Sequence, residues 1–136
     1  RIPQFLWKDP PQVCKCIISF YAWSDISQPG THPPLFKIPE QLDGNFTFIR
    51  EYCSANIPKI KPTVPDATYL VWLDCRELNM DNETLRTFMI EKAGLGLNEG
   101  YTFGRSLSGY MRLNAACPRS VLERALGQLK NAVDSL

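Results

Sequence analysis

The sequence predicts an α/β domain of the α+β sandwich kind, in which a small open sheet is covered by helices. Its 136 residues can enclose one hydrophobic core and are too few for two domains of ordinary size. Two stretches, 67–75 and 110–115, have the composition or the polar and apolar alternation of strands. Two others, 42–53 and 122–136, repeat apolar residues at helical spacing. Helices that alternate with strands along one short chain predict packed layers around a shared core.

Residues 1–39 are predicted to be a proline-rich leader of unassigned fold, which precedes the folded domain at 40–136. One long interval of the leader, Val13–Ser27, is free of proline, so only this part is expected to allow a short strand or helix. The leader is also more apolar than a solvated linker, and its large side chains are expected to pack on another surface. These side chains are Phe5, Leu6, Trp7, Phe20, Tyr21 and Trp23.

The domain is expected to open with a helix that ends near Asn56 and Pro58. Its inward residues recur at i, i+4, i+7 and i+11, namely Leu42, Phe46, Ile49 and Cys53. The stretch Ile60–Val64 predicts an edge strand, because Pro62 has no N–H to donate to a sheet ladder. The run A-T-Y-L-V-W-L-D-C at 67–75 then predicts a more central strand.

A second helix is predicted over Asn82–Ala93, with Asp81 as its N-cap and Gly94 as its C-terminal stop. The segment Leu95–Leu97 is predicted to form a short strand that leads into the turn-rich loop L-N-E-G-Y-T-F-G. A final helix is expected to begin around Pro118–Ser120. The inward residues of these two helices are predicted to be Leu85, Phe88 and Met89, then Leu122, Leu126, Leu129, Val133 and Leu136.

The charge and composition exclude several classes of function. The formal net charge is +1 and the Lys and Arg residues are scattered, which argues against binding to nucleic acid or to a membrane surface. No apolar run reaches the ~18–20 residues of a membrane span, and the first residues lack the pattern of a secretion signal, so a cytoplasmic location is expected. The five cysteines and the single histidine, His32, lack the spacing of a disulfide framework or a zinc site, so no metal is expected.

Arg112 stands at the centre of the predicted strand 110–115, where polar and apolar residues alternate. Two interpretations of this arginine are open. Its guanidinium either lies on a solvated face and pairs with Asp74, or points into a cleft and binds a carboxylate, whose two oxygens match its planar fork of donors. Tyr69 and Trp72 in the other strong strand are expected in the core, with a position in a cleft wall as the alternative.

Three segments carry a resemblance to a known family. They read P-D-A-T-Y-L-V-W-L-D-C-R-E-L, L-N-E-G-Y-T-F-G and G-Y-M-R-L-N-A-A-C-P-R-S-V-L-E-R-A-L. Over residues 40–136 the chain resembles the C-terminal small domain of pyridoxal-phosphate (PLP) enzymes of the aspartate-aminotransferase fold, known as fold type I. Within that superfamily it is most similar to carbon–sulfur lyases of the MalY/PatB cystathionine β-lyase type.

The resemblance implies β-elimination on cystathionine- or cysteine-type amino acids, which yields pyruvate, ammonia and a thiol. In that family the arginine of the R-L-N strand binds the substrate α-carboxylate, so this role is expected for Arg112. The residues expected in the cleft loop are Asn98, Gly100, Tyr101 and Phe103. Glu99 departs from the family, whose Asn-x-Gly turn usually carries proline at this position, and the loop is expected to be less restrained as a result.

PLP is implied as the cofactor of the complete enzyme, where a lysine in a Ser-x-x-Lys motif of the large domain binds it. No lysine of this chain has that context, so none of its residues is assigned a catalytic role. The isolated chain is expected neither to bind PLP covalently nor to act as a lyase. The implied partners are the amino-acid substrate and the missing large domain, and a homodimer is expected for the full-length enzyme only. Two alternatives stay open: an aminotransferase small domain, or a non-catalytic truncated copy that acts as an interaction module.

Overall fold

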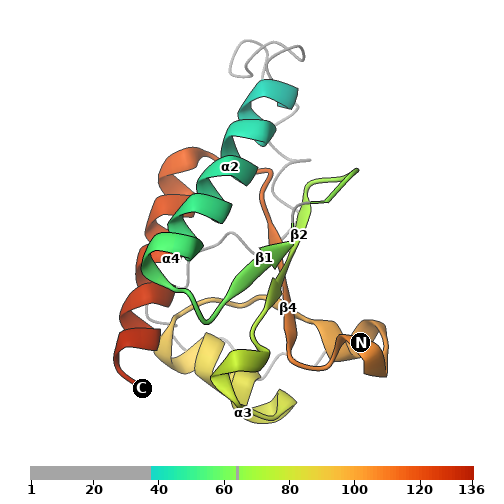
Figure 1. Ribbon diagram of the computed structural model, residues 1–136, viewed down its shortest axis with the longest axis vertical. Helices are drawn as coiled ribbons and strands as arrows, with labels where there is room; N and C mark the ends of the chain where they lie inside the picture. Colours follow the sequence, from blue (N-terminus) through green and yellow to red (C-terminus); the bar gives the residue numbers. More distant parts are fainter. Residues whose placement is uncertain (1–37, 64) are drawn as a thin grey trace, which may run out of the picture.

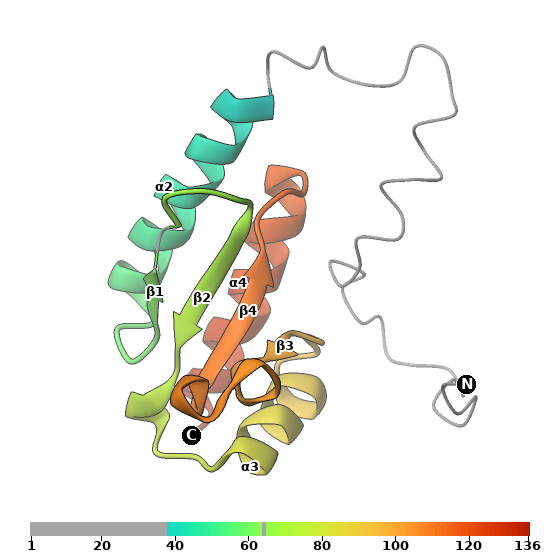
Figure 2. The ribbon, with the colours of Figure 1, turned by 90° about the vertical axis from the view of Figure 1, so that its right-hand side faces the viewer.

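The computed structural model describes residues 38–63 and 65–136, which form two layers (Figures 1 and 2). One layer consists of the helices α2 (Ile38–Asn56) and α4 (Arg119–Asp134). The other is a four-stranded antiparallel sheet with the order β1-β2-β4-β3. Its strands are β1 (Lys61–Thr63), β2 (Leu70–Asp74), β4 (Tyr110–Asn114) and β3 (Asn98–Glu99). The predicted α+β class, a small open sheet covered by helices, is confirmed.

Both long helices cover the same face of the sheet. Figure 2 views the sheet from the other face, so that β2 and β4 lie in front of the helices.

The predictions for the leader 1–39, including Val13–Ser27 and His32, lie outside the described residues, apart from the backbone of residues 38 and 39. In the described part of the chain, no helix combines the length and the apolar character that a membrane span requires.

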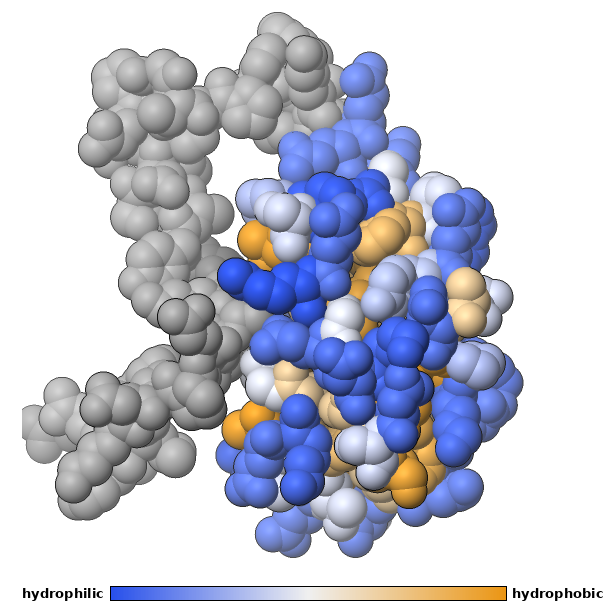
Figure 3. Space-filling view, turned by 90° about the vertical axis from the view of Figure 1, so that its left-hand side faces the viewer, coloured by the Kyte–Doolittle hydropathy of each residue, from blue (hydrophilic) through white to orange (hydrophobic). Residues whose placement is uncertain are grey.

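The hydrophobic core lies between the sheet and the two long helices. Val71 and Leu73 of β2, together with Met111 and Leu113 of β4, are at most 2% exposed and belong to this core. The helix residues that share it include Phe46, Ile49 and Cys53 of α2 and Leu122, Leu126 and Leu129 of α4, as the helical spacing predicts. Leu136 is an exception, because it follows the end of α4 and is 64% exposed. The outward faces of the two helices are largely hydrophilic (Figure 3).

The centre of the sheet consists of β2 and β4, which share five paired positions. Both edges are much shorter. β1 has three residues with Pro62 in the middle, as predicted for an edge strand. β3 at the opposite edge has only two residues. The sheet therefore depends mainly on the pairing of β2 with β4.

The strand predictions at 67–75 and 95–97 differ most from the structure. β2 begins at Leu70, three residues later than expected, because Thr68 has a φ of 76°, a left-handed conformation that a strand does not accommodate. The Thr68 hydroxyl accepts a hydrogen bond from the Leu70 N–H at 3.3 Å. No strand forms at 95–97, where the Leu95 N–H instead donates to the Met89 carbonyl at 2.7 Å and so completes the end of the preceding helix.

The second predicted helix exists but is not a regular α-helix throughout. Its first part, α3 (Asn82–Thr87), has Asp81 as its N-cap, whose carboxylate accepts a hydrogen bond from the Thr84 N–H at 2.7 Å. The continuation over Phe88–Lys92 is a π-helical turn. This wider turn allows its first two residues, adjacent in sequence, to be buried together. Gly94, with a φ of 64°, ends the helix as predicted.

Asn45 is a polar side chain inside the core, only 1% exposed. From α2 its Nδ2 donates hydrogen bonds to the backbone carbonyls of Ala115 and Cys117, each at 2.9 Å. These two carbonyls lie directly after β4. Asn45 therefore ties α2 to the connection between β4 and α4, and it satisfies the buried carbonyl of Ala115.

We expect Asn45→Ala to lower the free energy of unfolding by about 1–3 kcal/mol, because the buried Ala115 carbonyl loses this donor. Urea unfolding of the purified chain measures it. The matched control is Asn131→Ala on the exposed face of α4, which should change stability by no more than about 0.5 kcal/mol. Equal stabilities of the two variants would contradict the role given to Asn45.

Candidate functional site

The face of the sheet opposite α2 and α4 carries a row of large side chains. Trp72 of β2 and Arg112 of β4 are directly opposite each other across the two central strands. Asn98 of β3 is paired with Arg112 on its other side. Trp72 and Arg112 alternate with residues that point into the core, so both lie on the face of the sheet away from α2 and α4, which we call the open face.

Arg112 makes two contacts within the described residues. Its guanidinium carbon lies 4.2 Å from the centre of the Phe103 ring, a cation–π contact. Its Nη2 donates a long hydrogen bond, 3.4 Å, to the amide oxygen of Asn98. Its Nε is buried and has no hydrogen-bond partner in this part of the chain. A buried N–H without an acceptor is costly, so this donor is the feature of the site that most requires a partner.

Asp74 does not pair with Arg112, although it lies on the same face of β2. Its carboxylate binds Arg76 side-on, with Oδ1 at 2.9 Å from Nε and Oδ2 at 2.7 Å from Nη2. The Arg76 guanidinium also lies 5.0 Å from the centre of the Tyr110 ring. Of the ion pairs among residues 38–63 and 65–136, none includes Arg112. The interpretation that Arg112 is neutralised by Asp74 is therefore wrong.

Phe103 reaches Arg112 because its loop packs tightly on β4. The loop continues from β3 as a 3-10 turn at Gly100–Phe103. A Cβ at Gly100 would lie 2.4 Å from the Leu107 carbonyl oxygen, so only glycine fits there. The Phe103 ring also meets Trp72 edge-on, with the ring centres 5.7 Å apart. Arg112, Trp72, Phe103 and Asn98 thus form one group, which we call the Arg112 cluster.

The four residues predicted for the cleft loop have different surroundings, and their role in a cleft stays a prediction. Asn98 and Phe103 touch Arg112, and Gly100 allows the close packing. Tyr101 is 48% exposed, and among the described residues its side chain has no hydrogen bond or ring contact with the Arg112 cluster. Trp72, expected in the core, is half-buried on the open face instead. Its position in the alternation of β2, between the buried Val71 and Leu73, was the signal that could have placed it there.

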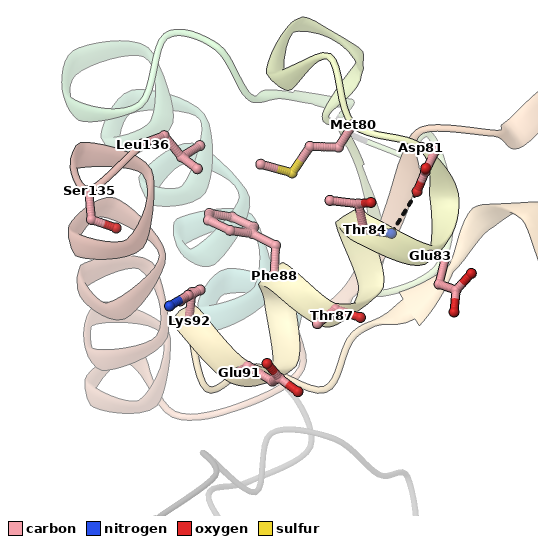
Figure 4. Close-up of a pocket in the computed structure, with 10 residues that line it drawn as sticks. All are labelled: Met80, Asp81, Glu83, Thr84, Thr87, Phe88, Glu91, Lys92, Ser135 and Leu136. Atoms are coloured by element: carbon pink, nitrogen blue, oxygen red, sulfur yellow. Dashed lines mark hydrogen bonds between the residues drawn. The ribbon is translucent and has the colours of Figure 1, made fainter.

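A separate cavity of about 550 Å³ opens between α3, the π-helical turn and the end of α4 (Figure 4). Met80, Phe88 and Leu136 converge on it, and polar side chains surround them. Its lining residues are Met80, Asp81, Glu83, Thr84, Thr87, Phe88, Glu91, Lys92, Ser135 and Leu136. None of them belongs to the Arg112 cluster. Nor do the described residues contain a group of three or more side chains suited to a metal ion.

The sequence is related to curated bacterial proteins, although no model of a protein family matches it. It is 41% identical to the protein MalY of Escherichia coli (strain K12) over 92 residues, which cover 68% of this chain and 24% of MalY. It is 32% identical to the cystathionine β-lyase PatB of Bacillus subtilis (strain 168) over 101 residues, 74% of this chain and 26% of PatB. The chain thus spans about a quarter of the length of the curated relatives it matches.

Solved structures show the same relationship. Cystalysin from Treponema denticola, whose crystal structure contains PLP, has a TM-score of 0.72 and 36% identity over 74% of this chain and 26% of its own. The PLP-bound C–S lyase from Staphylococcus hominis, solved with L-cycloserine, has a TM-score of 0.65 and 29% identity over 73% of this chain and 24% of its own.

Fold and sequence together define a class: the chain is homologous to one part of PLP-dependent enzymes of fold type I. Within that class the homology is to the cystathionine β-lyases of the MalY/PatB type, and it covers about a quarter of their length.

The Asp74–Arg76 pair predicts that the stability of the fold depends on pH. Hydrogen bonds from Arg76 hold the pKa of the Asp74 carboxyl below its ordinary value. A lowered pKa means that the pair stabilises the fold above the unfolded pKa of about 4, and that this contribution is lost as the pH falls through the folded pKa. Asp74→Asn should therefore be less stable than the wild type at pH ~7, and the difference should shrink below about pH 4.

Urea unfolding of both proteins across this pH range measures the difference. Asp43→Asn on the exposed face of α2 is the control, since it removes a carboxylate for which the structure gives no ion pair. A wild-type advantage over Asp74→Asn that is the same at every pH would be evidence against the pair as its source.

Proposed function

We propose that residues 40–136 are the small domain of a PLP-dependent carbon–sulfur lyase. In this role Arg112 binds the α-carboxylate of the substrate. The homology to PatB, a cystathionine β-lyase, and to the C–S lyase of Staphylococcus hominis supports the class of reaction. The unfilled donors of Arg112 support the binding role, and the buried Nε without an acceptor is the observation that carries it.

The Asp74–Arg76 pair shows how an arginine of this chain binds a carboxylate, and Arg112 can be compared with it. Arg76 binds a carboxylate through Nε and Nη2 at 2.9 and 2.7 Å. In Arg112 the same two donors are nearly free, because Nε has no acceptor among the described residues and Nη2 has only the long contact to Asn98. A ligand carboxylate is proposed to bind this edge of the guanidinium side-on in place of Asn98, and to reach the buried Nε as the Asn98 side chain moves aside.

The neighbours of Arg112 restrict how a carboxylate can bind. One flat face of the guanidinium lies against the Phe103 ring, so the ligand approaches the edge that carries Nε and Nη2. The rings of Trp72 and Phe103 make the surroundings less polar, which strengthens the ion pair. Two hydrogen bonds to one carboxylate also prevent it from rotating. The substituents on the substrate Cα are thereby held in one orientation.

The described residues do not complete a PLP site. Lys61 and Lys130 form ion pairs with acidic side chains, and Lys59 and Lys92 are exposed. None of these four has a hydrogen bond or ion pair with the Arg112 cluster. PLP, when bound, supplies an electron sink for the bonds at Cα. Its lysine and its phosphate ligands are proposed to belong to a separate large domain, and this chain contributes carboxylate binding only.

The same carboxylate site would also suit an aminotransferase. An aspartate aminotransferase of Pyrococcus horikoshii is 28% identical over 79 residues, against 32% over 101 residues for PatB. This difference favours the lyase. The substrate class that follows is cystathionine- or cysteine-type amino acids, with a thiol as the leaving group.

Arg112 can be tested by NMR on the ¹⁵N-labelled chain. Sodium acetate should shift the Nε–H signal of Arg112, because a carboxylate supplies its missing acceptor, whereas sodium chloride at equal ionic strength should not. Arg112→Lys should weaken acetate binding about tenfold, since a point charge replaces a two-point contact. Arg105→Lys, in an exposed turn of the same loop, is the matched control and should leave binding unchanged. Equal acetate shifts at all arginines would rule out a specific site.

The isolated chain is expected to release no pyruvate from L-cystathionine in the presence of PLP, because the described residues hold no lysine beside the site. A coupled pyruvate assay measures this, with full-length PatB as the positive control. Pyruvate formation, or a PLP absorbance band that borohydride abolishes, would contradict the proposal that the PLP lysine belongs to a separate large domain.

A further inference from the structure

The loop that carries Phe103 is attached to α3 at both of its ends. At its start, Glu99 accepts a contact of 3.2 Å from the Nε of Arg86. At its end, the amide oxygen of Asn82 accepts hydrogen bonds from the Ser108 hydroxyl at 3.0 Å and from the Gly109 N–H at 3.1 Å. Asn82 and Arg86 are one helical turn apart in α3. A single short helix therefore fixes the separation of the two ends of the loop.

The Gly109 end is the tighter of the two. Gly109 is buried with a φ of 80°, and a Cβ there would lie 2.7 Å from Cγ of Arg76. Its carbonyl also accepts a hydrogen bond from the Cys75 N–H at 2.9 Å. The N–H and the carbonyl of Gly109 are thus both held by hydrogen bonds, directly before β4 begins at Tyr110.

The Glu99 end is held more weakly. The side chains of Arg86 and Glu99 are 56% and 29% exposed, so salt screens their attraction and the pair contributes little on its own. Between the two ends, Phe103 is 51% exposed even though it touches both Arg112 and Trp72. Burial alone therefore does not hold the ring over Arg112, and the attachments of its loop have to contribute.

We propose that α3 positions the Arg112 cluster, with Asn82 and Arg86 as positioning residues that hold Phe103 and Asn98 against Arg112. The helix touches the loop and not the guanidinium, so its effect on the carboxylate site passes through the loop. The Arg86–Glu99 pair acts as the weaker attachment, which we call the latch, and Asn82 acts as the anchor at the Gly109 end of the loop. The expected effect on carboxylate binding rests on the proposed function, whereas the effect on the position of the loop does not.

The latch is tested by reversing its charges. Arg86→Gln should increase amide hydrogen exchange over residues 99–104 by about two- to fivefold at low salt, the range expected for a partly exposed pair. Arg86→Glu should act in the same direction. The double variant Arg86→Glu/Glu99→Arg should restore slow exchange, and exchange within α2 should stay unchanged throughout. If the double variant exchanges as fast as Arg86→Glu alone, or if Arg86→Gln has no effect, the latch is refuted.

The anchor is tested by a pair of substitutions at Asn82. Asn82→Ala removes the acceptor for Ser108 and Gly109, whereas Asn82→Asp keeps an oxygen in its place and suits the first turn of a helix. In a Trp7→Phe/Trp23→Phe background, Trp72 is the only tryptophan, and its fluorescence reports its edge contact with Phe103. Asn82→Ala should shift the Trp72 emission as Phe103→Ala does, and Asn82→Asp should not. Identical spectra for Asn82→Ala and the wild type would overturn the proposal.

Acetate titration of the same variants separates this inference from the proposed function. If acetate binds the wild type and binds about two- to fivefold more weakly to Arg86→Gln, α3 positions a working carboxylate site. If acetate binds neither protein while exchange and Trp72 emission respond as expected, the carboxylate role fails and the positioning role holds. If acetate binds both equally and the loop does not respond, the positioning role is wrong.

Discussion

The pairing of β2 with β4 is the constraint on which the other features of this molecule depend. The register sets Trp72 opposite Arg112 on one face, and Val71 and Leu73 beside Leu113 and Met111 on the other. Because side chains alternate along a strand, a shift of β4 by one residue would turn its guanidinium toward the core and expose Met111 and Leu113. The hydrophobic contacts with α2 and α4 therefore fix the register, and the register in turn fixes the position of Arg112. The same strand register thus determines both the packing of the core and the position of the candidate site.

Two arginines on the open face have different surroundings, and only one of them is paired with a carboxylate. Arg76 lies just after β2, where the chain turns, so its fork meets the carboxylate of Asp74 two residues earlier. Arg112 lies within β4, and its neighbours across the sheet are Trp72 and an amide, Asn98. Neither neighbour can neutralise a positive charge. Within residues 38–63 and 65–136, one guanidinium is therefore satisfied by a carboxylate and the other keeps a buried donor without an acceptor.

The sequence was sufficient to predict the layers and the helix faces, because alternation in 110–114 and helical spacing in 42–53 are repeated signals. It also indicated Arg112, since a charged residue inside an apolar strand is unusual. It did not indicate the partner of Asp74, which depends on the 3-10 turn that begins at Arg76. The start of β2 was misplaced because the left-handed conformation of Thr68 has no signature in a threonine-containing run. The contact between Phe103 and Arg112 depends on how a loop folds back, which no local pattern encodes.

The short edges of the sheet have a consequence for the behaviour of the protein in solution. An unpaired strand edge can recruit a second chain and extend the sheet from molecule to molecule. Here one edge is interrupted by Pro62, which has no N–H to offer, and the other ends after two residues at Gly100. Neither edge gives a second chain a continuous ladder of donors and acceptors. The domain can therefore place both long helices on one face of its sheet without promoting fibrous aggregation through its edges.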